Sequence, residues 1–240
     1  MICKNCSNEF LDDFRFCPHC GHPAQLKRID KNYFLDELAQ LFNLEKGILF
    51  TIRALLTKPA EHIRIYLTEN RSRYVKPIAF LIITSVLYAL FNKFLEFEKK
   101  AIKFETNETD IPNFTEIVSE NYEYFSILFS FLTALIVRLF FRKYPYNFFE
   151  VFVLQCYLHG VEMLISLFFG VLQSILKVEV ELTSYGFLLG FIYTFVITAQ
   201  FFDKTKIISY IKSLLASILS YIILLLIIAI SVFTYYVFFR

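Results

Sequence analysis

Five long stretches of the chain are almost entirely apolar, and each is long enough to cross a bilayer as a helix. A hydrocarbon core of about 30 Å takes about 20 helical residues. The chain is 57% hydrophobic, and its charged residues gather between these stretches rather than inside them. The stretches span residues 74–94, 122–141, 147–176, 185–202 and 213–239. This pattern predicts an all-α membrane protein with a five-helix transmembrane bundle over residues 74–240.

The third stretch, residues 147–176, is longer than a bilayer requires. As one straight helix it would measure about 45 Å. We therefore expect it to tilt, to project beyond the bilayer, or to break near Gly160.

Lysine and arginine are distributed unevenly between the connections, and this distribution predicts the orientation. Residues 1–76 contain 12 of them, and the connections after the second and fourth stretches are also basic. The two alternate connections, 95–121 and 177–184, contain more acidic than basic residues. We expect a multi-pass protein of the cell inner membrane with its N-terminus in the cytoplasm and its C-terminus outside.

Four of the five cysteines lie close to the N-terminus, before any apolar stretch. Cys3, Cys6, Cys17 and Cys20 form two Cys-x2-Cys pairs separated by ten residues. Two such pairs joined by a small hairpin supply four thiolates for a closed structural zinc site. Residues 1–24 are therefore predicted to form a zinc ribbon that depends on structural Zn²⁺ for folding. A disulfide pair or a rubredoxin-like iron centre are the alternatives.

Residues 25–73 have apolar side chains at helical spacing and basic residues beside them. Leu35, Leu38, Leu41 and Phe42 form one such group, and Ile48, Leu49, Ile52, Leu55 and Leu56 form the next. Short amphipathic helices with basic flanks suit the inner face of a bilayer that contains anionic lipids. Packing against the protein's own helical bundle explains the pattern equally well.

Polar and small residues within the third stretch recur with the period of a helix. They lie three or four positions apart, so they share one helix face: Gln155, His159, Glu162, Ser166, Gly170 and Gln173. Polar groups in a membrane usually face protein or water, because hydrocarbon offers them no partner. The pattern predicts an intramembrane polar site centred on Gln155, His159 and Glu162.

The chemistry of His159 and Glu162 leaves three interpretations open. The pair could lock the bundle through a mutual hydrogen bond, form a proton or ligand site, or contribute to a metal site. Nearer the cytoplasmic ends of the second and third stretches, Arg138 and Glu150 are predicted to form a structural ion pair across a tight turn.

Several segments together resemble a known family. The CPHCG head, KGILFTIRALLTKPAEHIRIYL, RSRYVKPIAFLIITSVLYALF and FFEVFVLQCYLH are similar to a family of bacterial membrane proteins catalogued as a domain of unknown function. The resemblance runs from Cys3 to about Lys206. It implies a zinc-ribbon head followed by a multi-span membrane domain, and it implies no activity.

The sequence contains none of the familiar catalytic motifs, and its net charge of +2 gives no reason to expect a nucleic-acid partner. We expect a non-enzymatic scaffold or interaction protein of the inner membrane. Its partners would be the lipid bilayer, a cytoplasmic protein bound through the ribbon, and further copies of the chain. The alternatives are a transporter or channel subunit that uses the polar stripe and, least favoured, an intramembrane enzyme.

Overall fold

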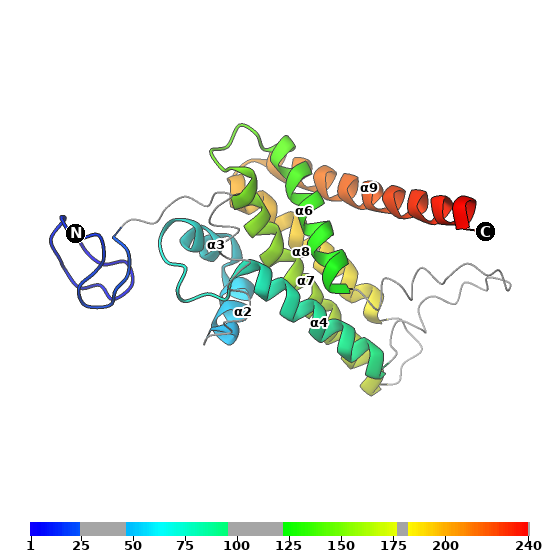
Figure 1. Cartoon of the computed structure of the whole chain (residues 1–240), viewed down its shortest axis with the longest axis horizontal. Coiled ribbons are helices and arrows are strands. Elements are labelled where there is room, and N and C mark those ends of the chain that lie inside the picture. The colour runs from blue at the N-terminus through cyan, green and yellow to red at the C-terminus, as the bar shows by residue number, and fades with distance from the viewer. Residues whose placement is uncertain (25–46, 96–121, 177–181, 240) are drawn as a thin grey trace. The chain divides into compact units, whose positions relative to one another are not determined.

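The computed structural model describes residues 1–24, 47–95, 122–176 and 182–239 (Figure 1). The chain divides into two compact units, Met1–Lys76 and Pro77–Arg240. Apart from two isolated β-bridges in segment 1–24, the described regular structure is helical. The predicted amphipathic group around Leu35 and the acidic connection 96–121 lie outside the described residues.

The first unit contains the cysteine-rich segment and two short helices, α2 (Ile48–Thr57) and α3 (Pro59–Thr68). Pro59 starts α3, a position that suits proline because its missing N–H is not needed there. Leu55, Ile63 and Tyr66 are almost fully buried, and α2 packs against α3. The buried Thr51 hydroxyl accepts a hydrogen bond from the backbone N–H of Val75 at 3.0 Å, which ties the end of this unit to α2.

The second unit begins with α4 (Pro77–Leu95), three residues later than the predicted start at Tyr74. Proline favours the first turn of a helix and disfavours helical geometry in the residue before it. Tyr74 instead belongs to the first unit, where its hydroxyl lies 2.7 Å from Nδ1 of His62.

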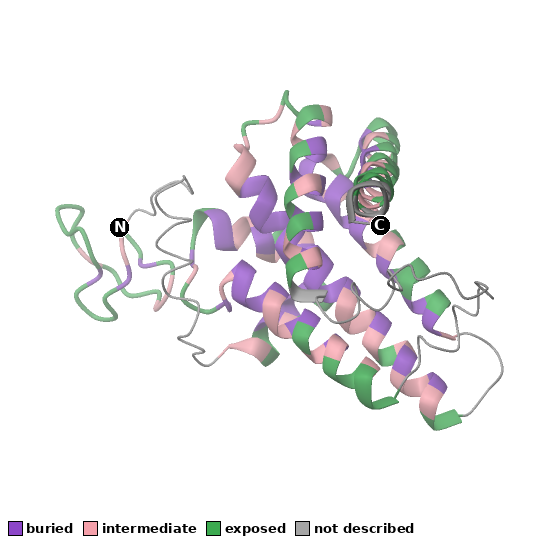
Figure 2. Ribbon diagram, turned by 45° about the vertical axis from the view of Figure 1, so that its right-hand side comes forward, coloured by how far each residue is buried: buried purple, intermediate pink, exposed green. Residues whose placement is uncertain are grey.

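The described residues of the second unit form four more helices, which are labelled in Figure 1. They are α6 (Tyr122–Phe140), α7 (Phe148–Leu176), α8 (Leu182–Asp203) and α9 (Ile207–Phe239). The central helix is α7, which packs against α4, α6 and α8, while α9 packs against α6 and α8. The purple of buried residues is accordingly concentrated along the first half of α7 (Figure 2).

Four of these helices, α4, α7, α8 and α9, are long and apolar enough to cross a membrane. The apolar part of α6, Tyr124–Phe140, is shorter, so the fifth predicted span stays a prediction. The α7 helix runs unbroken through Gly160, and the break considered from the sequence does not occur. A Cβ at Gly160 would lie 2.6 Å from the Phe80 ring, so this glycine allows α4 to approach closely.

The two halves of α9 have different surroundings. Ser209, Ser213 and Ser220 are buried in its first half. Beyond Tyr221, large apolar side chains such as Leu225 and Ile230 are each 63% exposed. This end of the helix diverges from α6 (Figure 1), and its apolar surface suits a lipid environment.

Candidate metal centre and buried polar cluster

The two cysteine pairs are presented by two similar tight turns. The N–H of Ser7 bonds to the carbonyl of Cys3 at 2.9 Å, and the N–H of Gly21 bonds to the carbonyl of Cys17 at 2.8 Å. The residue after each second cysteine is left-handed, with φ of 61° at Ser7 and 69° at Gly21. Glycine adopts this geometry freely, whereas the serine pays a modest steric cost. The repeated turn aims both thiols of each pair to the same side.

The four thiols converge on one point. The Sγ atoms of Cys3, Cys6, Cys17 and Cys20 all lie within 4.8 Å of one another. The Cys3–Cys20 separation is 3.5 Å and the Cys6–Cys17 separation is 3.7 Å. A zinc ion with tetrahedral Zn–S bonds of about 2.3 Å places its sulfurs about 3.8 Å apart. The separations fit that geometry and exceed the disulfide length of about 2.05 Å. The cluster could therefore hold a metal ion.

The two thiols of the first pair, Cys3 and Cys6, differ in pKa. Backbone N–H groups, first that of Cys6 and then that of Asn5, lower the pKa of Cys3 to about 6. The backbone N–H of Asn8 lowers the pKa of Cys6, but desolvation and the neighbouring Cys20 and Cys3 sulfurs outweigh it and raise the value to about 11. Four thiolates this close repel one another without a cation, so a metal ion that takes up the charge would release protons on binding.

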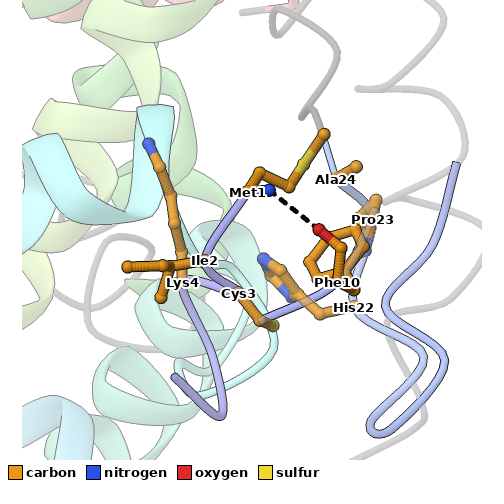
Figure 3. Close-up of a pocket in the computed structure, with 8 residues that line it drawn as sticks. All are labelled: Met1, Ile2, Cys3, Lys4, Phe10, His22, Pro23 and Ala24. Carbon is orange, nitrogen blue, oxygen red and sulfur yellow. Dashed lines mark hydrogen bonds between the residues drawn. The ribbon is translucent and has the colours of Figure 1, made fainter. Parts of the chain in front are cut away.

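His22 follows the last cysteine and has a partner of its own. It is 7% exposed, and its Nε2 lies 3.0 Å from the carbonyl oxygen of Glu69, just after α3. His22 also lines a cavity of about 150 Å³ with Cys3 and Phe10 (Figure 3). The contact with Glu69 gives His22 a structural role. This agrees with the four cysteines being the metal ligands.

A second contact joins the first cysteine turn to the end of α3. The Asn70 side chain, 3% exposed, donates from Nδ2 to Oδ1 of Asn5 at 2.8 Å. Its own Oδ1 accepts from the N–H of Ser72 at 3.0 Å. Asn5 lies between two of the metal-binding candidates, so both cysteine turns are bonded to the same short segment, Glu69 and Asn70.

In the second unit, the structure brings His159 and Glu162 together inside the bundle. Nδ1 of His159 lies 2.8 Å from Oε2 of Glu162, and the two residues are 4% and 5% exposed. Tyr221, from α9, donates its hydroxyl to the other carboxylate oxygen at 3.0 Å. Both carboxylate oxygens therefore have partners. The Phe129 ring packs against His159 and against Tyr221, with centroids 4.7 Å away in each case.

The small residues of α8 bring that helix against this cluster. A Cβ at Gly190 would lie 2.6 Å from Cγ of Glu162. Gln155, one turn before His159, donates to the Thr198 hydroxyl at 3.4 Å. At the far end of the stripe, Oε1 of Gln173 accepts two hydrogen bonds from Thr183, each 2.9 Å long. The stripe therefore faces protein.

Some buried polar atoms of the described bundle have no hydrogen-bond partner. They include Nε2 of His159 and the hydroxyl oxygens of Ser130 and Ser166. An unpaired buried polar group costs about 1–3 kcal/mol. The free nitrogen of His159 is therefore the atom of this cluster with unused capacity to bind.

Glu150 forms reciprocal hydrogen bonds with Asn147 at the start of α7. It accepts a hydrogen bond from the Asn147 N–H at 2.7 Å, while the Asn147 side chain accepts from the Glu150 N–H at 2.9 Å. This reciprocal arrangement is a capping box at the start of α7. Nη1 of Arg138 is buried without a hydrogen-bond partner among the described residues. The Arg138–Glu150 pair stays a prediction.

A family model matches part of the chain. The model of a family described as a protein of unknown function, DUF3667, matches residues 45–89. The matched segment covers α2, α3 and most of α4, and excludes the four cysteines and the α7 cluster. This is narrower than the resemblance expected from the sequence. No curated protein and no solved structure matches.

Proposed function

We propose that this chain is a non-enzymatic, polytopic inner-membrane scaffold with a structural zinc ribbon in the cytoplasm. The convergence of four thiols within 4.8 Å carries the proposal. The chemistry of four thiolates in two tight turns favours zinc, because such sites are closed and tetrahedral and leave no open position for catalysis. A reducing cytoplasm keeps the thiols available for the metal.

The ribbon's contacts support a role in interaction. Asn5 and His22 tie both cysteine turns to Glu69 and Asn70, so the ribbon contacts the segment that leads toward α4. Other parts of the ribbon surface carry large exposed side chains, among them Leu11 and Phe16 at 71% and 59%. A cytoplasmic protein partner would bind this free surface.

Comparative affinity purification in mild detergent tests the scaffold role. The wild-type chain and a Cys17→Ser/Cys20→Ser variant would be tagged at the same place and purified in parallel. We expect specific partners to be lost from the variant while the bundle is still recovered in the membrane fraction. Identical partner sets for the two proteins would contradict a ribbon-dependent scaffold.

Reporter fusions test the orientation. The proposed topology places fusions at Lys100 and Ser184 outside, and fusions at Lys143 and Lys204 in the cytoplasm. A cytoplasmic signal at Lys100 would contradict the inferred orientation or α4 as a span. A signal from outside at Lys143 would contradict α6 as the fifth span.

One observation favours a transporter or channel subunit as the second candidate. Nδ1 of His159 lies 2.8 Å from the carboxylate of Glu162, and Nε2 is buried without a partner among the described residues, which leaves that nitrogen available to a transported proton. Proton flux into proteoliposomes, followed with an enclosed pH dye, tests this role. Transport requires that Glu162→Gln abolish the flux while the melting temperature stays near that of the wild type. If the wild-type chain shows no proton flux, the transport role is contradicted and the His159–Glu162 pair keeps the role of locking the bundle.

A further inference from the structure

One face of α2 is apolar, exposed and interleaved with positive charge. Leu49 is 80% exposed and Leu56 is 56% exposed. Arg53 is exposed between them at i, i+4 and i+7 spacing, so the three share one helix face. We propose that this α2 face, Leu49–Arg53–Leu56, inserts into the surface of an anionic phospholipid bilayer.

The charge balance of this part of the chain matches such a surface. No acidic residue lies within α2, and residues 47–76 contain six basic residues and two acidic ones. Phe50 is 41% exposed and lies next to Leu49, at the edge of the same face of α2. The guanidinium of Arg73 lies 6.0 Å from the centroid of its ring. Each basic residue near an anionic membrane surface contributes favourably to binding.

Arg53 distinguishes a lipid partner from an apolar protein partner. If the face packed against apolar helices, the guanidinium would be desolvated without a carboxylate to pair with. At a bilayer surface, the aliphatic part of the side chain lies along the apolar layer and the charged end reaches the phosphates. Leucines on either side of an arginine therefore suit a lipid surface better than a protein interior.

Chain connection keeps α2 close to the start of a candidate span. The Val75 N–H bonds to the Thr51 hydroxyl in α2 at 3.0 Å, and α4 begins at Pro77. Two residues extend at most about 7 Å. If α4 crosses the bilayer, α2 therefore lies near the interface. The inference rests on the proposed membrane location of the bundle, and it does not depend on the role of the ribbon.

Tryptophan fluorescence can locate the face in the full chain, because the sequence contains no tryptophan. Leu49→Trp and Leu56→Trp would be placed separately in bilayers of phosphatidylcholine and phosphatidylglycerol. Brominated lipids quench a tryptophan in the bilayer, and acrylamide quenches one in water. We expect both variants to lose most of their fluorescence to brominated lipid and little to acrylamide.

Two matched controls calibrate the measurement. Leu11 is a 71% exposed leucine beside Asp12 and Asp13 in the ribbon, so Leu11→Trp should respond to acrylamide only. Leu189 is 45% exposed within α8, so Leu189→Trp should respond to brominated lipid. If Leu189→Trp does not respond to the lipid, the proposed membrane location fails rather than the assignment of the α2 face.

Two outcomes would overturn the inference while the Leu189→Trp control succeeds. Strong acrylamide quenching at Leu49→Trp and Leu56→Trp would place the face in water. Quenching by neither reagent would place it against protein, either the bundle or a second copy.

A charge reversal tests the electrostatic contribution. Adding Arg53→Glu to Leu56→Trp should increase acrylamide quenching in bilayers with phosphatidylglycerol, and change it little in phosphatidylcholine alone. Arg15→Glu, an equal charge reversal on the ribbon, should not change acrylamide quenching in either lipid. An equal effect of Arg53→Glu in both lipids would remove anionic lipid as the partner.

Discussion

The cysteine-rich segment and α7 differ in how far their residues are buried. In segment 1–24, Cys3 and Cys17 are buried, but Phe14 and Phe16 are 48% and 59% exposed, so there is little core. In α7, by contrast, every residue from Glu150 to Glu162 is buried. A small segment without a core depends on a metal for its fold, whereas a buried helix depends on its packing and on the pairing of its polar groups. The two regions should therefore fail under different changes.

The largest effect is expected from removing one thiol of the ribbon. Cys17→Ser should abolish zinc binding and unfold residues 1–24, because structural zinc contributes about 10–16 kcal/mol in comparable small units. The bundle should stay folded. Elemental analysis of purified protein should find one zinc per wild-type chain and none in the variant.

Cys156→Ser is the matched control, because Cys156 is a cysteine buried within α7. It should keep the zinc. Zinc loss in both variants would mean that the metal depends on the bundle, and a wild-type protein without zinc would remove the metal centre itself.

The next largest effect is expected within the α7 cluster. Glu162→Leu leaves Nδ1 of His159 and the Tyr221 hydroxyl without the carboxylate that both contact. The cost is about 1–3 kcal/mol for each buried group, so the melting temperature of the bundle in detergent should fall. Zinc content should not change. Glu162→Gln keeps an acceptor for Tyr221 and should cost less, so equal losses for Leu and Gln would contradict the locking role.

Packing around the same residue gives a smaller effect. Gly190→Ala would place a Cβ 2.6 Å from Cγ of Glu162, near the root of that side chain, so α7 and α8 must separate slightly. Overpacking of this kind costs about 1–3 kcal/mol. Thermal unfolding in detergent measures it, with Leu189→Ala on the exposed side of α8 as the control. No difference between the two variants would mean that the helices do not approach as closely as described.

The patterns that could be read from the sequence are those set by local spacing. Two Cys-x2-Cys turns bring thiols together whatever surrounds them, and a helical period places His159 and Glu162 on one face. Tyr221 could not be found in this way. It lies far beyond Glu162 in the sequence, and only the packing of α9 brings its hydroxyl to the carboxylate.

The interpretation of Glu150 missed a local signal. Asn147 and Glu150, three residues apart before an apolar run, form a capping-box pattern that is visible in the sequence. The closeness of Arg138 to the same turn predicts charge pairing, and that pair stays a prediction. The starts of α4 and α9 were missed for a related reason, because hydropathy locates apolar stretches but not helix ends.

The smallest effect should come from the contact that joins the ribbon to the end of α3, and it tests whether the metal centre depends on that contact. Asn5→Ala removes the acceptor for Nδ2 of Asn70 and leaves the four thiols intact. One such hydrogen bond contributes about 0.5–1.5 kcal/mol. Hydrogen exchange at Glu69–Ser72 should become faster, while the zinc content stays at one per chain. Asn8→Ala, an exposed position in the same cysteine turn, should leave this exchange unchanged. If zinc were lost together with the contact, the metal would depend on α3, and the ribbon would not be an independently stabilised region.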